Sequence, residues 1–137
     1  MEHLNNKYVL NFIAELLDLS SSPKSSYFPA SDQFWENVVK IGSSHLVLPA
    51  IYSALKRKKL EFNVPKDLLI YLKEISKLNE NRNINIFKQI EFISKIFKQN
   101  DIEYVFLKGA ALLISQPYNV IEERMIGDID ILVAESD

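Results

Sequence analysis

The hydrophobic pattern changes its period near residue 100, and this change constrains the fold more than any other feature of the sequence. Up to Gln99, apolar residues recur at spacings of three or four, which is typical of helices that bury one face. Beyond that point "IEYVFL" (102–107) and "DIDILVA" (128–134) are short runs rich in β-forming residues. A small apolar segment between them, 109–115, reads as a helix. The sequence therefore predicts an α+β fold in which a helical region is followed by strand, helix and strand.

Four helices are predicted before the change of period. The first covers 4–19, with apolar residues from Leu4 to Leu17, and the second covers 32–44, with Ser31 or Asp32 as its cap and Gly42 at its end. The third begins near Pro49, whose ring suits a first turn. The fourth covers 65–99, either as one helix with an exposed polar waist at "NENRNIN" (79–85) or as two helices, and we favour one. Serines and prolines predict a loop before the second helix, and 116–127 is predicted as a loop before the last strand.

Composition excludes several classes of protein. The chain has 137 residues, 47% of them hydrophobic and 25% charged, which suits one globular domain or part of one. A net charge of -2 argues against a general nucleic-acid binder. The absence of cysteine excludes disulfides and thiolate metal sites, and His3 and His45 are far apart in sequence. A metal would therefore need carboxylate ligands, which favours Mg²⁺ or Mn²⁺. Since no signal peptide or membrane-spanning run is apparent, we expect a cytoplasmic protein that does not enter a membrane.

Two aspartates in the last predicted strand are the strongest sign of chemistry. Because side chains alternate along a strand, Asp128 and Asp130 would project on the same side, with Ile129, Ile131 and Val133 facing a core. Two carboxylates about 7 Å apart along the backbone, at ~3.3 Å per residue, can converge on one or two cations. Two-metal phosphoryl transfer needs such a pair. The alternative is a strand end that carries solvated carboxylates.

The sequence "LKGAALL" supplies what an anion site would need. Gly109 stands where a strand turns into a helix, and without a side chain it lets the backbone approach a phosphate closely. The first N–H groups of a helix and its positive dipole end favour the same ligand. Lys108 could add a charge. The alternatives are that Gly109 serves only the turn and that Lys108 is an ordinary surface lysine.

These residues also carry a family resemblance. "FLKGAALL", Tyr118 and "ERMIGDIDILV" closely resemble the signature of an uncharacterised bacterial nucleotidyltransferase family of the polymerase-beta-like superfamily, and they are also similar to abortive-infection toxin nucleotidyltransferases. The upstream "SSHLVLPAIYSAL" is similar to the family's helical N-terminal part. The resemblance implies a helical region at 1–100 and the N-terminal part of a nucleotidyltransferase core, with a mixed sheet, at 101–137. It also implies Mg²⁺ (or Mn²⁺), a nucleoside triphosphate, and transfer of a nucleoside monophosphate to an acceptor such as a tRNA, a protein or a small molecule.

The resemblance assigns roles to individual residues. It implies that Asp128 and Asp130 are the catalytic, metal-binding pair, and that the nucleotide and its phosphates are bound at Lys108, Gly109, Ala110 and Arg124. Arg124 would contact the nucleotide or brace the aspartates, or else pair with a neighbouring glutamate on a surface loop.

Two features depart from the family pattern. Ala110 stands where a glycine or serine is usual, so no hydroxyl reaches a phosphate there. The third carboxylate of these enzymes belongs to a later strand, and Glu135 and Asp137 are poor substitutes because they lie on or just past the same strand. We therefore expect the chain to be the N-terminal piece of a longer enzyme whose sheet is truncated here.

A different class of function also fits part of the sequence. The run Lys56–Arg57–Lys58–Lys59 and the apolar helix stripes could belong to a non-catalytic module that binds a protein or RNA. The simpler alternative for this run is a solvated helix end, where cations complement the helix dipole. An incomplete sheet would also expose apolar surface, so self-association remains open.

Overall fold

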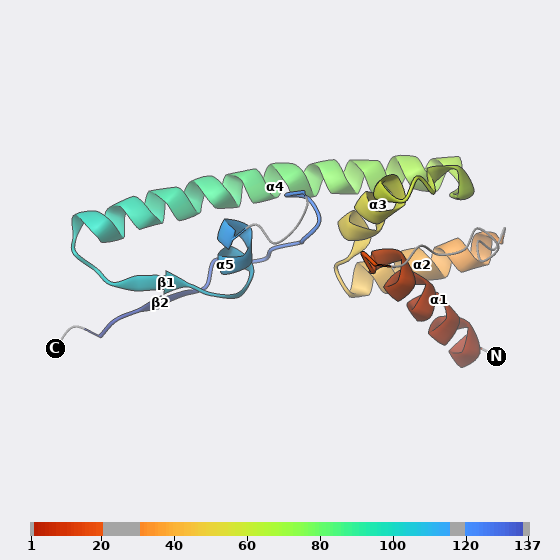
Figure 1. Ribbon diagram of the computed structural model, residues 1–137, viewed down its shortest axis with the longest axis horizontal. Helices are drawn as coiled ribbons and strands as arrows, with labels where there is room; N and C mark the ends of the chain where they lie inside the picture. The colour runs from red at the N-terminus through yellow and green to blue at the C-terminus, as the bar shows by residue number, and fades with distance from the viewer. Residues whose placement is uncertain (1, 21–30, 116–119, 136–137) are drawn as a thin grey trace. The chain divides into compact units, whose positions relative to one another are not determined.

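The computed structural model describes residues 2–20, 31–115 and 120–135, with the side chains of the first helix described from residue 6 onward (Figure 1). Along the chain its elements are α1 (Glu2–Leu17), α2 (Asp32–Ser44), α3 (Leu48–Arg57), the 3-10 turn η2 (Glu61–Asn63), α4 (Lys66–Gln99), β1 (Tyr104–Phe106), α5 (Lys108–Ser115) and β2 (Ile131–Val133). The order confirms the predicted α+β class.

Packing divides the chain into two compact units. Unit 1 is Met1–Ser76 and unit 2 is Lys77–Asp137, so the boundary lies inside α4. Each unit has its own cluster of buried apolar residues. The functional division predicted between residues 100 and 101 is a different boundary, and it stays a prediction.

Unit 1 is built on the apolar stripes that the sequence predicts. The buried side chains come from α1, α2, α3 and the first turns of α4: Val9, Phe12, Ile13, Leu16, Phe34, Trp35, Val38, Ile51, Leu55 and Leu72. The ring of Phe12 meets Phe34 and Trp35 edge-on, with centroids 5.1 and 5.9 Å apart, a favoured aromatic geometry. This unit is therefore held mainly by hydrophobic burial.

The prediction that Gly42 ends the second helix is wrong. Helix α2 continues to Ser44, and the left-handed residue after it is Leu46, with φ 57°. A Cβ atom on Gly42 would lie 2.8 Å from Leu48 Cδ2 and 2.9 Å from Ile51 Cδ1. The glycine is therefore used to let α3 approach α2 closely, and the end of the helix needs no glycine.

Part of the basic run, Lys58, makes hydrogen bonds within the fold. Lys58 follows the last turn of α3, and its Nζ donates to the carbonyl oxygens of Glu15 (2.9 Å) and Asp18 (2.6 Å) at the end of α1. Partial burial of the ammonium lowers the pKa of Lys58, and neighbouring Arg57 lowers it further, while the Asp18 carboxylate opposes the shift. Lys56 Nζ lies 5.7 Å from the centre of the Tyr52 ring. Lys58 therefore stabilises the end of a helix.

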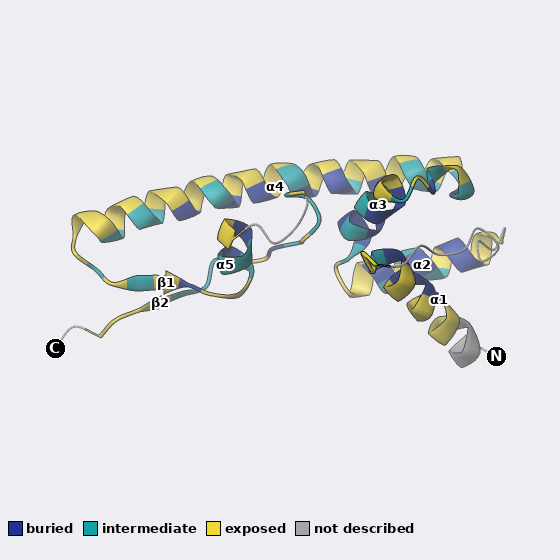
Figure 2. Cartoon of the chain, viewed as in Figure 1, coloured by how far each residue is buried: buried dark blue, intermediate teal, exposed yellow. Residues whose placement is uncertain are grey.

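Helix α4 is one helix of 34 residues, as predicted, but its polar middle is not an exposed waist. Its buried positions follow one stripe at alternating spacings of four and three: Leu72, Ser76, Asn79, Asn83, Ile86 and Ile90 (Figure 2). Asn79 is 3% exposed and Asn83 is 0% exposed. The apolar stripe is thus continued through the middle by two buried asparagines.

In unit 2, α5 and a two-stranded sheet pack against the second half of α4. Strands β1 and β2 are antiparallel, with Phe106 opposite Ile131 and Tyr104 opposite Val133. The buried residues of this cluster are Ile86, Ile90, Phe106, Ala110, Leu113 and Ile126, and both Ile129 and Ile131 pack against it. The prediction that Ile129 and Ile131 face a core is confirmed, whereas Val133 is 43% exposed.

The predicted start of the last strand is wrong. Strand β2 begins at Ile131, so Asp128 and Asp130 precede it. Strand β1 ends at Phe106, and the chain turns into α5 at Lys108, so β1 offers no further residues for 128–129 to pair with. The ladder extends only as far as Asp130, whose carbonyl accepts a hydrogen bond from the Leu107 N–H at 2.9 Å.

Candidate functional site

The register of the small sheet brings the paired aspartates to the start of α5. Because the strands are antiparallel and Phe106 lies opposite Ile131, Leu107 after β1 lies opposite Asp130 before β2. Helix α5 begins one residue later, at Lys108. Two segments more than twenty residues apart in sequence are therefore fixed side by side by backbone hydrogen bonds.

An ion pair joins the two segments. Lys108 Nζ lies 3.1 Å from Asp130 Oδ1. The Lys108 side chain is 72% exposed and that of Asp130 is 26% exposed. Such a solvent-accessible pair contributes about 0–1 kcal/mol. Either partner can therefore leave the ion pair and contact a ligand at little energetic cost. Asp128 is exposed to solvent.

The backbone at the strand-to-helix junction differs from the expectation for Gly109. The left-handed residue is Lys108, with φ 48°, and Gly109 has an ordinary negative φ. A Cβ atom on Gly109 would instead lie 3.1 Å from Ile126 Cγ2, a tight contact that would force the isoleucine to shift. The missing side chain thus lets α5 pack closely on the segment that leads into Asp128.

The first turn of α5 has groups of the kind that bind anions. The Ala111 N–H donates to the Leu107 carbonyl at 3.3 Å, so the N–H groups of Gly109 and Ala110 precede the first such bond. The Ala110 side chain is fully buried, so only its backbone could reach a ligand. Together with the exposed Lys108 ammonium, this arrangement suits a phosphate better than a neutral group.

A divalent cation at Asp128 and Asp130 would need substrate and water ligands in addition to these two carboxylates. In the described part of the chain, no cluster of three or more His, Cys, Asp and Glu side chains forms a closed metal site. Mg²⁺ commonly takes only one or two protein carboxylates and completes its shell with phosphate and water oxygens. Asp128 and Asp130 supply two carboxylates, and the N-terminus of α5 lies beside Asp130.

Four backbone carbonyls of the loop before the aspartates accept hydrogen bonds from side chains of α4. They belong to Ile121, Glu122, Arg124 and Gly127. Asn79 Nδ2 donates to the carbonyls of Glu122 (2.7 Å) and Arg124 (2.9 Å). Asn83 Nδ2 donates to the carbonyls of Ile121 (2.6 Å) and Arg124 (2.8 Å).

Arg82 of α4 makes the hydrogen bond to the fourth carbonyl, that of Gly127. Arg82 Nη2 lies 3.3 Å from the Gly127 carbonyl. Sequence reasoning missed Asn79, Arg82 and Asn83. The available signal was the spacing of the two asparagines, because residues four apart on a helix share a face and these two continue the apolar stripe.

The remaining predicted residues contribute less to this site. The Arg124 side chain is exposed, and its backbone carbonyl is the part that α4 holds. Glu135 is exposed beyond β2, while Tyr118 and Asp137 lie outside the described residues. The structure therefore brings Lys108 and Asp130 into contact and leaves the role of the Arg124 side chain a prediction.

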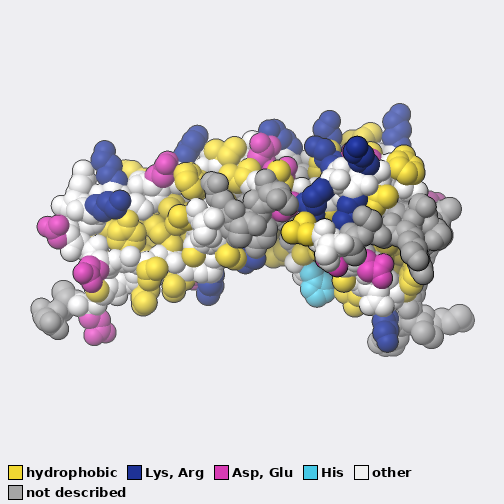
Figure 3. Space-filling view, viewed as in Figure 1, with side chains coloured by type: hydrophobic (Ala, Val, Ile, Leu, Met, Phe, Trp, Pro, Cys, Tyr) yellow, Lys and Arg dark blue, Asp and Glu magenta, His cyan; other side chains and the backbone are white. Residues whose placement is uncertain are grey.

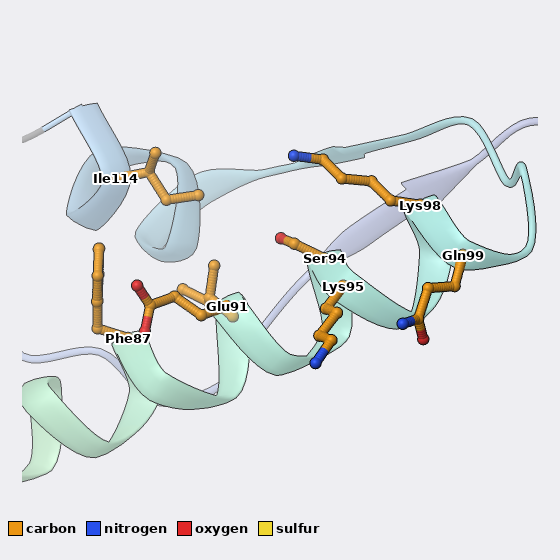
Figure 4. Close-up of a pocket in the computed structure, with 8 residues that line it drawn as sticks. Phe87, Glu91, Ser94, Lys95, Lys98, Gln99 and Ile114 are labelled. Carbon is orange, nitrogen blue, oxygen red and sulfur yellow. The ribbon is translucent and has the colours of Figure 1, made fainter.

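Unit 2 also has an open groove of about 570 Å³, lined by residues of α4 from Phe87 to Gln99 and by Ile114 of α5 (Figure 4). Ile114 lies across from Phe87, and Lys98 extends over the groove. None of Lys108, Gly109, Asp128 and Asp130 lines it. Figure 3 shows hydrophobic side chains exposed among Lys, Arg, Asp and Glu side chains on the surface of the molecule.

Comparison with known proteins adds one match. A protein family described as "uncharacterised nucleotidyltransferase" matches residues 31–137, which include both aspartates and the start of α5. No curated protein and no solved structure matches the chain. Separately, none of the helices in the described ranges combines the length and the apolar character needed to cross a bilayer.

Proposed function

The chain belongs to this family of uncharacterised nucleotidyltransferases, and on that premise we propose that it transfers a nucleoside monophosphate from a nucleoside triphosphate to an acceptor at the site formed by Asp128, Asp130 and the start of α5. The observation that carries the proposal is the 3.1 Å contact between Lys108 and Asp130. It joins the start of α5 to Asp130, and Asp128 precedes Asp130 by two residues in the chain. Both halves of the site lie within the matched residues.

The residues of α5 would bind the triphosphate. The N–H groups of Gly109 and Ala110 donate to phosphate oxygens, and the helix dipole favours their negative charge. Lys108 exchanges Asp130 for a phosphate oxygen, which costs little because the lysine is 72% exposed. This exchange leaves the Asp130 carboxylate available when the nucleotide is present.

The carboxylates would hold the divalent cation, Mg²⁺ or Mn²⁺, through Asp128 and Asp130. When bound, that cation supplies charge neutralisation for the triphosphate and the leaving group. An acceptor hydroxyl forms a bond to the α-phosphorus, the bond from that phosphorus to the bridging oxygen breaks, and pyrophosphate leaves with release of the hydroxyl proton. The acceptor is a tRNA, a protein or a small molecule.

The proposal is tested by measuring binding of ATP, GTP, CTP and UTP separately, with and without Mg²⁺, by equilibrium dialysis. We expect the parent to bind at least one of them in a Mg²⁺-dependent manner. Asp128→Asn and Asp130→Asn keep side-chain size and remove one negative charge each, so each should weaken that binding at least tenfold.

Asp101→Asn is the matched control. Asp101 is exposed, lies outside the site, and has a left-handed backbone (φ 52°) that asparagine also tolerates. It should bind nucleotide like the parent. If the Asp128 and Asp130 variants bind as tightly as the parent and the control, the assignment of the metal and nucleotide site is wrong.

A further inference from the structure

The two buried asparagines of α4 are unusual for their position. Asparagine is a poor residue for a helix interior, and a polar side chain that is 0–3% exposed must find partners. Both Nδ2 groups find them in the loop, but Asn79 Oδ1 and Asn83 Oδ1 are buried without a partner in the described part of the chain. Apolar residues of similar size would avoid those unmet acceptors. The hydrogen bonds that the two asparagines donate to the loop therefore explain their presence better than hydrophobic burial does.

What they hold is the backbone that leads into the aspartates. The carbonyls of Ile121, Glu122 and Arg124 accept their four hydrogen bonds, at 2.6–2.9 Å. The carbonyl orientation also fixes which end of each amide faces the loop, because only the NH₂ end can donate. Rotation of either amide would place an oxygen against these carbonyls.

The same segment is held again closer to the aspartates. Ile126 is buried and packs against Gly109, Gly127 accepts from Arg82 Nη2, and the Asp130 carbonyl accepts from Leu107. Asp128 is thus an exposed residue between Gly127 and Asp130, whose carbonyls are both hydrogen-bonded. Its backbone is fixed by α4 on the N-terminal side and by the β1–α5 junction on the C-terminal side.

We propose that Asn79 and Asn83 are positioning residues of the nucleotidyltransferase site: by holding three carbonyls of the 121–124 segment, they set the backbone from which Asp128 and Asp130 reach the cation and nucleotide. The inference rests on the proposed function. It concerns residues that act through the loop and touch neither substrate nor metal.

The test compares Asn79→Asp/Asn83→Asp with Asn81→Asp/Asn85→Asp. The first pair keeps side-chain size but removes the donors that face the carbonyls. The second makes the same chemical change at exposed positions of the same helix segment. Two quantities are measured for each protein: amide hydrogen–deuterium exchange in residues 120–131, and Mg²⁺-dependent affinity for the nucleotide that the parent binds. Circular dichroism checks that the helices are retained.

We expect the Asn79/Asn83 variant to exchange at least tenfold faster in residues 120–131 and to bind nucleotide at least tenfold more weakly, with the control unchanged in both. If buried charge unfolds the double variant, Asn79→Ala serves instead, because Asn83 still holds the Arg124 carbonyl in that variant. It should show the same two effects, each smaller.

The outcomes separate this inference from the proposed function. Faster exchange with unchanged nucleotide affinity means that the asparagines only stabilise the loop, and it overturns the positioning role while leaving the proposed function in place. Unchanged exchange also overturns it. If the parent binds no nucleotide, or Asp128→Asn binds as well as the parent, the proposed function itself fails and the positioning role fails with it.

Discussion

At the scale of single residues, Lys108 combines a left-handed backbone with a charge beside Asp130. Its φ of 48° is uncommon for a residue other than glycine or asparagine, and local strain of this kind is often found at functional sites. A glycine would relieve the strain but would lose the ammonium. A lysine in this strained conformation is consistent with a role for its charge.

Replacing Lys108 by Asn separates charge from strain, because asparagine tolerates the left-handed backbone. We expect stability to change by less than about 1 kcal/mol, since the ion pair is exposed. Nucleotide affinity should fall about tenfold, the size of one lost contact to a charged group. Chemical denaturation and equilibrium dialysis measure the two effects.

Lys108→Arg is the control, because it retains the positive charge, and it should bind close to the parent. An equal loss of affinity in both variants would show that the charge is not what the site requires. A large loss of stability in Lys108→Asn would show that the lysine acts mainly in folding.

At the scale of elements, the ends of helices are set by contacts between elements. Helix α3 ends at Arg57, Lys59 then adopts the left-handed region (φ 56°), and the Leu60 N–H donates to the Leu55 carbonyl at 2.9 Å. The Nζ of Lys58, which lies between Leu55 and Leu60 in the chain, donates to the carbonyls of Glu15 and Asp18 at the end of α1. A basic run that could have signalled RNA binding thus includes a residue that joins two helices of unit 1.

Lys58→Met should therefore destabilise unit 1 by about 1 kcal/mol at pH 7, the usual net value of such hydrogen bonds. The pKa of Lys58 is lowered in the folded state, so between that pKa and the ordinary lysine value of about 10.4 the unfolded chain binds more protons. Stability of the parent relative to Lys58→Met should thus rise as pH increases through this window and stay constant below it. Urea denaturation from pH 7 to pH 10.5 measures this.

Lys40→Met is the matched control, because Lys40 is exposed on α2 and its replacement by Met removes the same positive charge. Because this variant keeps Lys58, its stability should retain the rise with pH over the window. A Lys58→Met protein whose relative stability falls as pH rises would contradict the sign of the shift.

At the scale of the whole molecule, two separate hydrophobic cores share one long helix. Ile51 is 0% exposed in the cluster of unit 1, and Ile90 is 3% exposed in the cluster of unit 2. No residue belongs to both clusters among those the structure describes. Loss of packing in one core should therefore be felt mainly in that unit.

Ile51→Ala and Ile90→Ala should each cost about 2–5 kcal/mol, the usual range for such cavities. Hydrogen–deuterium exchange should accelerate in α2 and α3 for the first variant, and in β1, α5 and β2 for the second. Exposed Ile84→Ala is the control and should change exchange little. Equal acceleration in both units by either variant would mean that the two cores unfold together.

Much of the candidate site was accessible from the sequence. The pairing of Asp128 with Asp130, the glycine after Lys108 and the short helix that follows are local patterns, and the family resemblance rests on the same residues. The strand boundary was missed because it depends on where β1 stops. The asparagines were missed because helix propensity marks them only as unfavourable, and their carbonyl partners lie about forty residues away.

The sequence by itself determined the α+β order of elements, the apolar faces of the helices and the residues that could carry chemistry, because these depend on period, composition and neighbours in the chain. Only the tertiary structure decided that Lys108 meets Asp130, that Gly109 makes room for Ile126, and that Asn79 and Asn83 hold the loop before the aspartates. Each of these depends on strand register or on the approach of distant backbones. Such contacts form only when the chain packs, and no local pattern encodes them.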